Sequence, residues 1–283
     1  LIERREIMTG TTWHLLRTES TSPAENMAID EAIANWVAKG ELKPTLRFYS
    51  WAPHAISVGR FQRATRDLDR DALTKNNIPV VRRLTGGRAV LHADELTYSV
   101  ILPESTPALP TNIIESYRLL TEGVRRGYHE LGVPAEFSVP LTEEDREALR
   151  KPKSAVCFDA ASYYELAVNG KKIAGSAQVR HQGAVLQHGS IPLSVDDEVL
   201  FDCFAMEEHE KREAKSRFSE KAVALNDTLQ RFVSFDEVAA AFETGFKDAF
   251  SLTFEPLVFT KEQQSEIDLL VKKYESDEWV WKR

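Results

Sequence analysis

Short runs rich in β-branched and aromatic residues lie between two long helical segments, and this order constrains the fold of the chain most strongly. The first helix is expected to begin at Pro23, after the cap residue Ser22, and to end at Gly40. The second is expected between Asn112 and Gly132, where apolar residues recur at helical spacing. Five strand-like runs lie between these helices, at residues 45–49, 55–58, 79–83, 88–91 and 96–102.

The second half of the chain continues this alternation with a hairpin. Asn169-Gly170 has the composition of a type I′ turn, so the flanking runs 163–168 and 171–179 are expected to pair. A further strand, expected over 184–193, would continue this sheet after a turn.

From Asp196 onward the chain is expected to be mostly helical. Ser234 and Thr260, each followed three residues later by Glu or Gln, have the sequence of helix caps. The whole pattern predicts an α+β fold, with a mixed, largely antiparallel β-sheet packed with helices, rather than a doubly wound parallel sheet.

Composition excludes several classes of protein. In the 283-residue chain, 36 Lys and Arg against 44 Asp and Glu give a formal net charge of −8, which argues against a nucleic-acid-binding protein. Hydrophobic residues make up 42% of the chain, which excludes general disorder. Two cysteines, Cys157 and Cys203, are too few for a disulfide scaffold or a Cys-rich zinc site. No histidine pair has HxH or HExxH spacing, so no metal centre is expected.

The sequence carries no signal for a membrane or for export. No apolar run approaches the roughly 20 residues that a transmembrane helix needs, and the first residues lack the apolar core of a signal peptide. We therefore expect a cytoplasmic protein with reduced thiols and no membrane partner, and a monomer fits its hydropathy. Met8 is a candidate start, which would make residues 1–7 an upstream extension.

The stretch RRLTGGRAV, residues 82–90, is the most unusual in the chain. Two arginines end one apolar strand, a glycine pair permits positive φ, and Arg88 starts the next strand. Backbone N–H groups at such glycines can approach a ligand, and arginines suit phosphate or carboxylate. A glycine hairpin turn with solvated arginines is the alternative. The stretch matches neither a Walker loop nor GxGxxG, so no standard fingerprint demands ATP.

Cys157 is the candidate nucleophile. A lone cysteine among apolar and aromatic residues is most often a small buried hydrophobe. Cys157 differs because it follows a charged segment and precedes a hairpin that carries Lys171 and Lys172. A nearby ammonium lowers the pKa of a thiol and makes the thiolate available. Cys203 is interpreted as a packing residue without a role.

Histidines offer no mechanism from spacing alone. His92 and His188 lie near the candidate site, but hydrogen-bonded structural histidines are the more common case. No GxSxG elbow is present, and a Ser-His-Asp triad cannot be assembled from the sequence.

Several motifs together resemble the superfamily of lipoate ligases, octanoyltransferases and biotin ligases. RRLTGGRAVLH resembles its arginine–glycine loop, and GKKIAGSAQ resembles its lysine-bearing strand. The resemblance covers nearly the whole chain, from NMAIDEA through RFYSW, SVG, ELTYSV and CFDAASYYEL to SDEW. It is nearest to the single-cysteine octanoyltransferases of Gram-positive bacteria, because of Cys157 in SAVCFDA and Arg88 where ATP-dependent lipoate ligases typically have a third glycine. The GRGR-type loop of biotin ligases is not seen.

One motif departs from the family pattern. His-Asp often follows the loop directly, whereas Ala93 stands here between His92 and Asp94, so no role is assigned to an acid at this point. For the whole chain, the resemblance implies a biotin/lipoate ligase-like catalytic domain over residues 12–255. An N-terminal extension over 1–11 would precede it, and a helical tail over 256–283 would pack on it.

The same resemblance implies octanoyl transfer from octanoyl-acyl carrier protein to the acceptor lysine of the glycine-cleavage H protein, a lipoyl domain, early in lipoate assembly. Cys157 would carry the octanoyl group as a thioester, in ping-pong kinetics without ATP or another cofactor. Lys172 would lower the pKa of that cysteine. The residues expected at the substrate are Arg83, Thr85, Gly86, Gly87, Arg88, Ala89, His92, Gly175, Ser176 and Ala177.

An octanoyl chain and an acidic carrier protein add two expectations. Burial stabilises the chain by about 0.8 kcal/mol per CH₂, so an apolar tunnel is expected, with walls at residues 84–90 and Tyr98. An acidic donor calls for a local basic rim despite the net negative charge. The candidates for this rim are Arg60, Arg63, Arg82, Arg83, Arg88, Lys171 and Arg180.

Three alternatives remain open at this point. An ATP-dependent lipoate–protein ligase would use the loop from Arg83 to Arg88 on phosphate and would not need Cys157. An octanoyl amidotransferase, which moves octanoate from H protein to other lipoyl domains, also uses one cysteine. A non-catalytic protein would only bind an acyl group or a lipoyl domain.

Overall fold

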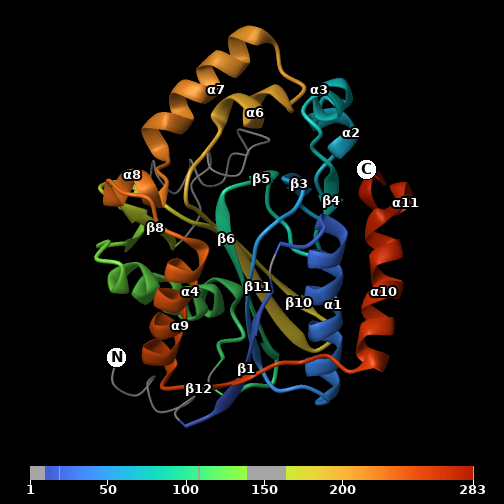
Figure 1. The fold of residues 1–283 in the computed structure, drawn as a ribbon, viewed down its shortest axis with the longest axis vertical. Helices are drawn as coiled ribbons and strands as arrows, with labels where there is room; N and C mark the ends of the chain where they lie inside the picture. The colour runs from blue at the N-terminus through green and yellow to red at the C-terminus, as the bar shows by residue number, and fades with distance from the viewer. Residues whose placement is uncertain (1–9, 19, 108, 139–163, 283) are drawn as a thin grey trace.

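A six-stranded β-sheet lies at the centre of the structure, with helices on both of its faces (Figure 1). This computed structural model describes residues 10–18, 20–107, 109–138 and 164–282. The strand order is β10-β11-β6-β2-β1-β12, antiparallel from β10 to β2 and parallel from β2 to β12. The predicted α+β class with a mixed sheet is confirmed. The strands of this sheet are β1 (Thr12–Arg17), β2 (Thr45–Tyr49), β6 (Glu95–Pro103), β10 (Gly175–His181), β11 (Ala184–Pro192) and β12 (Thr253–Pro256).

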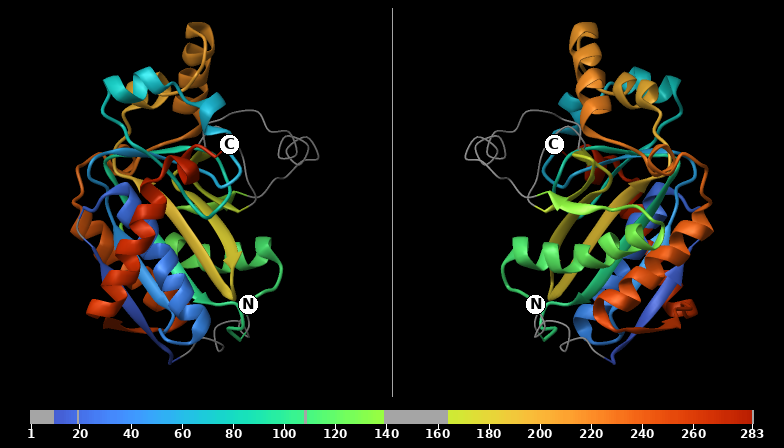
Figure 2. Two further views of the ribbon diagram at one scale, coloured as in Figure 1. Left: turned by 90° about the vertical axis from the view of Figure 1, so that its right-hand side faces the viewer. Right: turned by 90° about the vertical axis from the view of Figure 1, so that its left-hand side faces the viewer.

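Side chains alternate between the two faces of the sheet, so each face packs against its own pair of helices. Leu46 and Phe48 of β2 belong to the apolar cluster shared with α4 and α9. Tyr49 belongs to the opposite cluster, shared with α1 and α10, which lie side by side (Figures 1 and 2). The four helices are α1 (Pro23–Lys39), α4 (Ile113–Glu130), α9 (Phe235–Phe250) and α10 (Lys261–Glu275).

Helix α1 starts and stops as its sequence predicts. The Ser22 hydroxyl accepts a hydrogen bond from the Glu25 N–H at 3.2 Å, and Pro23 occupies the first helical position. Gly40 adopts the left-handed conformation at φ 74°, where a side chain would be strained. Because α1 is buried against both the sheet and α10, it brings polar residues such as Asp30 into the interior.

The other helix starts are also confirmed, since side chains of Asn112, Ser234 and Thr260 cap α4, α9 and α10. Within the described residues, no helix has both the length and the apolar character needed to cross a bilayer. The shorter helices are α2 (Ala64–Asp67), α3 (Arg70–Lys75), α6 (Asp197–Asp202), α7 (Glu208–Lys221), α8 (Leu225–Leu229) and α11 (Asp277–Val280).

Two small sheets flank the large one. The first has the strand order β4-β3-β5, and its apolar side chains cluster with α2, α3, α6 and α7. The second has the order β7-β8-β9. Their strands are β3 (Ala55–Val58), β4 (Val80–Arg82), β5 (Val90–His92), β7 (Glu136–Ser138), β8 (Glu165–Val168) and β9 (Lys171–Lys172).

The predicted hairpin is only partly right. Asn169 and Gly170 form the turn with φ of 50° and 78°, and β8 pairs with β9. The expected return strand over 171–179 is wrong as one strand, because it breaks at Ile173 and Ala174. Both residues are buried in the main core, so the chain leaves one sheet there and enters the large sheet as β10.

The chain from β12 onward packs on the rest of the fold. β12 pairs with β1, and α10 packs on α1. The domain boundaries drawn at residues 11 and 255 stay a prediction.

Buried Arg82 ties the C-terminal helix α11 to the turn after β3. Its guanidinium donates hydrogen bonds to the carbonyls of Trp279 and Val280 at one side. At the other side it donates to the carbonyls of Gly59, Arg60 and Gln62. The Trp279 indole N–H returns a bond to the Arg82 carbonyl at 2.8 Å.

Replacing this arginine should loosen α11. Arg82→Met leaves several buried carbonyls without donors, so we expect the free energy of unfolding to fall by about 2–5 kcal/mol. Urea denaturation measures this change, and limited proteolysis should cut the chain near α11 first. Arg231→Met, which removes an exposed partner of Glu237, should leave both results unchanged. Equal stability of the two variants would contradict the assigned role of Arg82.

Candidate active site

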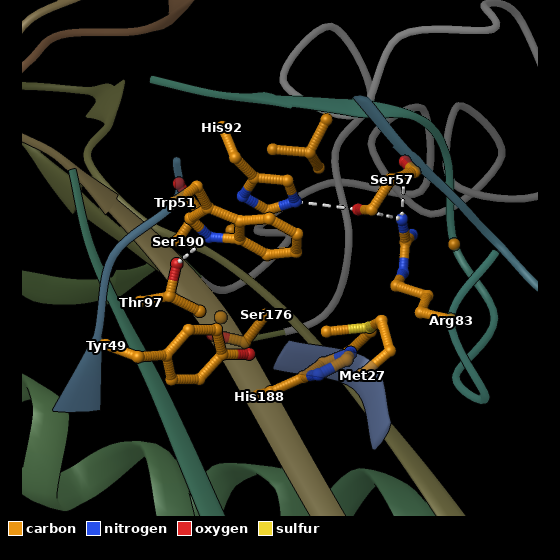
Figure 3. Close-up of a pocket in the computed structure, with 15 residues that line it drawn as sticks. Met27, Tyr49, Trp51, Ser57, Arg83, His92, Thr97, Ser176, His188 and Ser190 are labelled. Carbon is orange, nitrogen blue, oxygen red and sulfur yellow. Dashed lines mark hydrogen bonds between the residues drawn. The ribbon is translucent and has the colours of Figure 1, made fainter. Parts of the chain in front are cut away.

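A pocket lies where the large sheet meets the small sheet β4-β3-β5. About 440 Å³ of space lies between its walls, part of it open to solvent. Figure 3 shows Trp51, His92, Ser57 and Arg83 around this space, with Met27 of α1 opposite His92. The lining residues are Met27, Tyr49, Trp51, Ser57, Arg83, Gly87, Val90, His92, Thr97, Gly175, Ser176, Ala177, His188, Gly189 and Ser190.

Behind the lining residues Tyr49 and His188 lies an unusual concentration of buried polar groups. Asp30 of α1 accepts hydrogen bonds from Arg47 Nη1 at 2.8 Å and from Ser99 Oγ at 2.9 Å. The Tyr49 hydroxyl donates to its other oxygen at 3.2 Å. Strand alternation places these partners on the α1 face of the sheet, so Asp30 meets a complementary surface.

One hydrogen-bonded chain runs from Asp30 to the glycine loop. His188 Nδ1 lies 3.3 Å from Asp30 Oδ2, and His188 Nε2 lies 2.7 Å from Thr85 Oγ1. Since Arg83 Nε donates to Thr85 Oγ1 at 3.1 Å, the Thr85 hydroxyl proton is directed to His188 Nε2. The imidazole is therefore assigned as neutral, with its proton on Nδ1 facing Asp30.

A second chain of the same kind runs through the other side of the pocket. His92 Nδ1 lies 2.8 Å from Glu95 Oε1, and His92 Nε2 lies 2.7 Å from Ser57 Oγ. Arg83 Nη1 donates to Ser57 Oγ at 3.0 Å, so the serine proton is directed to His92 Nε2. Trp51 stacks on the His92 ring at 4.0 Å between centroids and holds it in place.

Arg83 connects the two chains. Besides Thr85 and Ser57, it donates from Nη2 to the carbonyls of Gly86 and Arg88, at 2.9 and 2.7 Å. Nη1 also donates to the Ser57 carbonyl at 2.9 Å. Each of its five N–H groups therefore has an acceptor within the protein. The buried guanidinium of Arg83 therefore fixes the backbone of the glycine loop.

The glycine loop packs too closely against β3 for a larger residue. A Cβ atom at Gly59 would lie 2.1 Å from the Gly87 carbonyl oxygen. Gly87 itself has φ of 90°, a conformation that favours glycine. The two glycines let the loop lie directly on the end of β3, beside Ser57.

Burial and neighbouring charges set the protonation states around His188. Burial lowers the pKa of the His188 imidazole, and the charge of Arg83 lowers it further, against the opposite effect of Asp30. Burial would raise the pKa of the Asp30 carboxyl, but the hydrogen bond from His188 and the charge of Arg47 hold it below its usual value. The pair is therefore a neutral imidazole beside a carboxylate.

Glu95 is ionised for similar reasons. Burial would raise the pKa of its carboxyl, but His92 and the hydroxyls of Ser190 and Thr97 hold it below the ordinary value. Ser190 Oγ donates to Glu95 Oε2 at 2.6 Å, and Thr97 Oγ1 donates to Oε1. The acid beside the histidine is thus Glu95, whereas Asp94 is bonded to Ser194 at the surface.

Lys172 lies on β9, shortly before the pocket residues of β10. Its side chain is buried, and Nζ donates to Glu165 Oε1 at 2.5 Å. A buried ammonium needs an anionic partner, and Glu165 supplies one. Cys157 lies outside the described residues.

The structure brings most of the predicted substrate residues together, although their roles stay predictions. Arg83 donates hydrogen bonds to Thr85, Gly86 and Arg88, and these three residues do not line the pocket themselves. Ala89 is buried instead in the apolar cluster of the small sheet. The predicted residues that line the pocket are Arg83, Gly87, His92, Gly175, Ser176 and Ala177.

Only part of the wall predicted for an acyl tunnel lines this pocket, and the tunnel itself stays a prediction. Val90 lines the pocket, but Leu84 and Tyr98 are buried in apolar clusters and are not among the described lining residues. Tyr98 faces α4 and α9 because alternation on β6 turns its neighbour Thr97 toward the pocket.

The predicted basic rim also needs correction. Arg82 and Arg83 are 0% and 5% exposed, so neither belongs to a surface rim. Arg63 is exposed. The candidates that are half-buried are Arg60, Arg88, Lys171 and Arg180.

Cys203 is a packing residue, as expected. It is fully buried in the cluster of the small sheet, and burial raises the pKa of its thiol to about 11. A thiol in this state is a poor nucleophile near neutral pH.

Several residues that line the pocket, or that bond to its lining, were not predicted from sequence. Polar residues inside apolar strands are a signal that could have found Ser57 in AISV and Glu95 at the start of ELTYSV. Asp30 lies in the motif NMAIDEA, which was noted without a role. The apolar and aromatic lining residues Met27 and Trp51 look like ordinary core positions in the sequence.

The state of His188 predicts a pH dependence of stability. An unfolded histidine has a pKa near 6.5, and the folded value is lower. Below about pH 6.5 the unfolded chain therefore binds more protons, and stability falls as the pH decreases toward the folded pKa. In His188→Gln this contribution is absent, so the loss of unfolding free energy from pH 7 to pH 5 should be smaller than in the wild type. Asp30 contributes only at lower pH, because its folded pKa lies below its ordinary value.

Urea denaturation at pH 7 and pH 5 measures this difference. His54→Gln replaces an exposed histidine and should lose as much unfolding free energy from pH 7 to pH 5 as the wild type. Equal losses in the wild type and in His188→Gln would contradict the neutral state assigned to His188.

Curated relatives match nearly the whole chain in sequence. Octanoyltransferase LipM from Exiguobacterium sp. strain AT1b is 96% identical over 276 residues, which cover 98% of this chain and 100% of that protein. Octanoyltransferase LipM from Staphylococcus aureus is 46% identical, over 96% of this chain and 99% of that protein.

Solved structures of lipoate-protein ligases have a similar fold. The bi-partite lipoate protein ligase of Thermoplasma acidophilum, described with its E2 lipoyl domain, has a TM-score of 0.78 and 26% identity over 96% of each chain. A lipoate-protein ligase A bound with ATP has a TM-score of 0.76 and 26% identity over 96% of this chain and 99% of that one. Residues 22–247 match the lipoyl protein ligase A/B catalytic domain. The resemblance inferred from the sequence is confirmed, and the chain belongs to the lipoyl protein ligase A/B catalytic domain family.

Proposed function

We propose that this protein is an octanoyltransferase that moves an octanoyl group from a carrier thioester to a lysine of a lipoyl domain, in lipoate synthesis. The observation that carries this proposal is the 96% identity over the full length of a protein named Octanoyltransferase LipM. Identity of 65% over 96% of the chain to a second such protein supports the same activity. The expectation of an acyltransferase is thereby confirmed at the level of the family.

The pocket suits an acyl chain beside a reactive carbonyl. Met27, Trp51 and Val90 add apolar surface to its lining, and their contact with an alkyl chain stabilises the bound donor. Gly175, Ser176, Ser57 and the imidazoles of His92 and His188 add polar groups to the same lining. An octanoyl group can place its chain against the apolar side chains and its carbonyl near the polar ones.

In the proposed mechanism, the Cys157 thiolate attacks the donor thioester. The new C–S bond forms as the carrier thiolate leaves and takes a proton, so the exchange needs no ATP. The acceptor lysine, as free amine, then attacks the enzyme thioester. The bond to Cys157 breaks as the amide forms, and the leaving thiolate takes the proton that the amine loses. Lys172, held by Glu165, supplies the positive charge that favours the thiolate. No cofactor takes part.

For the donor we propose octanoyl-acyl carrier protein, and for the acceptor the glycine-cleavage H protein. A structural relative, a lipoate protein ligase described together with its E2 lipoyl domain, supports a lipoyl domain as acceptor. We also propose that the protein works in the cytoplasm as a monomer.

An ATP-dependent lipoate ligase is the second candidate, favoured by the structural similarity to ligases at 26% identity. That reading would direct the arginine–glycine loop to a phosphate. Arg83, however, uses each of its five N–H groups on protein acceptors. The much higher identity to octanoyltransferases also favours the transferase.

The proposed nucleophile can be identified by intact-mass spectrometry. Mixing the protein with octanoyl-acyl carrier protein, without ATP, should add the mass of one octanoyl group, located on Cys157 by peptide mapping. Cys203 should stay unmodified because its buried thiol is protonated. No adduct on the wild type, or a near-normal transfer rate in Cys157→Ser, would contradict the mechanism. Activity only with ATP and free octanoate or lipoate would support the ligase.

The adjacent lysines allow a matched test of Lys172. Lys172→Ala should raise the pKa of the Cys157 thiol, so that alkylation by iodoacetamide begins at higher pH than in the wild type. Lys171→Ala removes an ammonium whose Nζ donates to the Ser219 carbonyl and should leave the profile unchanged. Coinciding profiles for the wild type and Lys172→Ala would remove Lys172 from this role.

A further inference from the structure

Ser57 has the surroundings of an activated serine. Its Oγ lies 2.7 Å from His92 Nε2, and His92 Nδ1 lies 2.8 Å from Glu95 Oε1. The three residues come from β3, β5 and the start of β6, so regular strands hold them. Figure 3 shows Ser57 and His92 on the same side of the pocket, joined by this hydrogen bond. The nucleophile is thus within hydrogen-bond reach of a base, and the base is within hydrogen-bond reach of an acid that orients it.

The hydrogen bonds around Ser57 fix the direction of its proton. Arg83 Nη1 donates to Ser57 Oγ, which leaves the hydroxyl proton for His92 Nε2. Glu95 fixes the imidazole tautomer through Nδ1, and stacking on Trp51 fixes the ring plane. Deprotonation of the hydroxyl by His92 therefore needs no rearrangement, and the neighbouring guanidinium favours an alkoxide.

The parallel chain through His188 shows what distinguishes Ser57. Thr85, His188 and Asp30 have the same order of hydroxyl, imidazole and carboxylate. Thr85 does not line the described pocket, whereas Ser57 does. Only the serine chain therefore ends at the space that an acyl group would occupy.

We propose that Ser57 is a second acyl-accepting nucleophile and that the pocket hydrolyses medium-chain acyl esters and thioesters through an ester on Ser57. The Ser57 proton passes to His92 Nε2 as the Oγ–acyl bond forms. The bond to the leaving alcohol or thiol breaks, and the leaving group takes that proton from His92. Water then attacks the ester and gives a proton to His92, and the acyl–Oγ bond breaks. The fatty acid leaves, and Ser57 regains its proton.

This proposal uses the proposed function only for the class of acyl group. The test therefore starts from Cys157→Ala, in which the cysteine route is absent. The probe is p-nitrophenyl octanoate, and release of p-nitrophenolate is measured. We expect Cys157→Ala to hydrolyse it at least about tenfold faster than Cys157→Ala/Ser57→Ala. Cys157→Ala/Ser116→Ala removes an equally buried hydroxyl on α4, which does not line the pocket, and should keep the rate.

A second measurement does not depend on folding of the Ser57 variant. An alkyl fluorophosphonate, which modifies activated serines, should label Cys157→Ala, with the added mass located on Ser57. Cys157→Ala/His92→Gln should be labelled much more slowly at neutral pH, because the base is absent. Equal hydrolysis with and without Ser57, or label found only at other residues, would overturn the proposal.

These outcomes are separate from those of the octanoyltransferase test. Failure of Cys157 to form an adduct would contradict the proposed function and leave the result for Ser57 standing. Loss of the Ser57 reaction would leave transfer through Cys157 intact.

Discussion

The buried guanidinium of Arg83 is the group on which the geometry of the pocket depends. A buried cation is costly unless hydrogen bonds and opposite charges compensate it. Here Asp30 and Glu95 supply the opposite charges, and each is connected to Arg83 through a histidine and a hydroxyl group. Arg47, a second buried arginine, pairs with Asp30 directly. The two arginines and the two carboxylates of this network thus balance in charge, and each element that supplies one of them is fixed relative to the others.

Consecutive arginines act in opposite directions because side chains alternate along a strand. Arg82 turns toward α11 and ties the C-terminal helix to the turn after β3. Arg83 turns toward the pocket and shapes the glycine loop. Two adjacent positions therefore connect α11 with the wall of the pocket. The arginines beside the glycine loop thus hold the fold together, which their composition alone does not indicate.

Local sequence patterns predicted the elements well and the interactions of the site poorly. Caps such as Ser22 and turns such as Asn169-Gly170 depend on a few neighbouring residues, so they can be read from the sequence. The break of the strand after Lys172 cannot be read from the sequence, because it depends on the burial of Ile173 in the main apolar cluster. The same holds for the acid beside His92. That partner is Glu95, three residues away, and it meets His92 because the chain bends at residues 93–94 between β5 and β6.

The chemistry of the two proposed nucleophiles explains how transfer can prevail over hydrolysis. A thioester reacts with an amine more readily than an oxygen ester does, so an octanoyl group on Cys157 is suited to a lysine acceptor. An octanoyl group on Ser57 reacts more slowly and is exposed to water during that time. The bond from Arg83 to Ser57 Oγ stabilises an alkoxide but also lowers its nucleophilicity, since a stabilised anion attacks less readily. The network that orders the pocket therefore also restrains the serine, and it favours the cysteine route as long as an acceptor lysine is present.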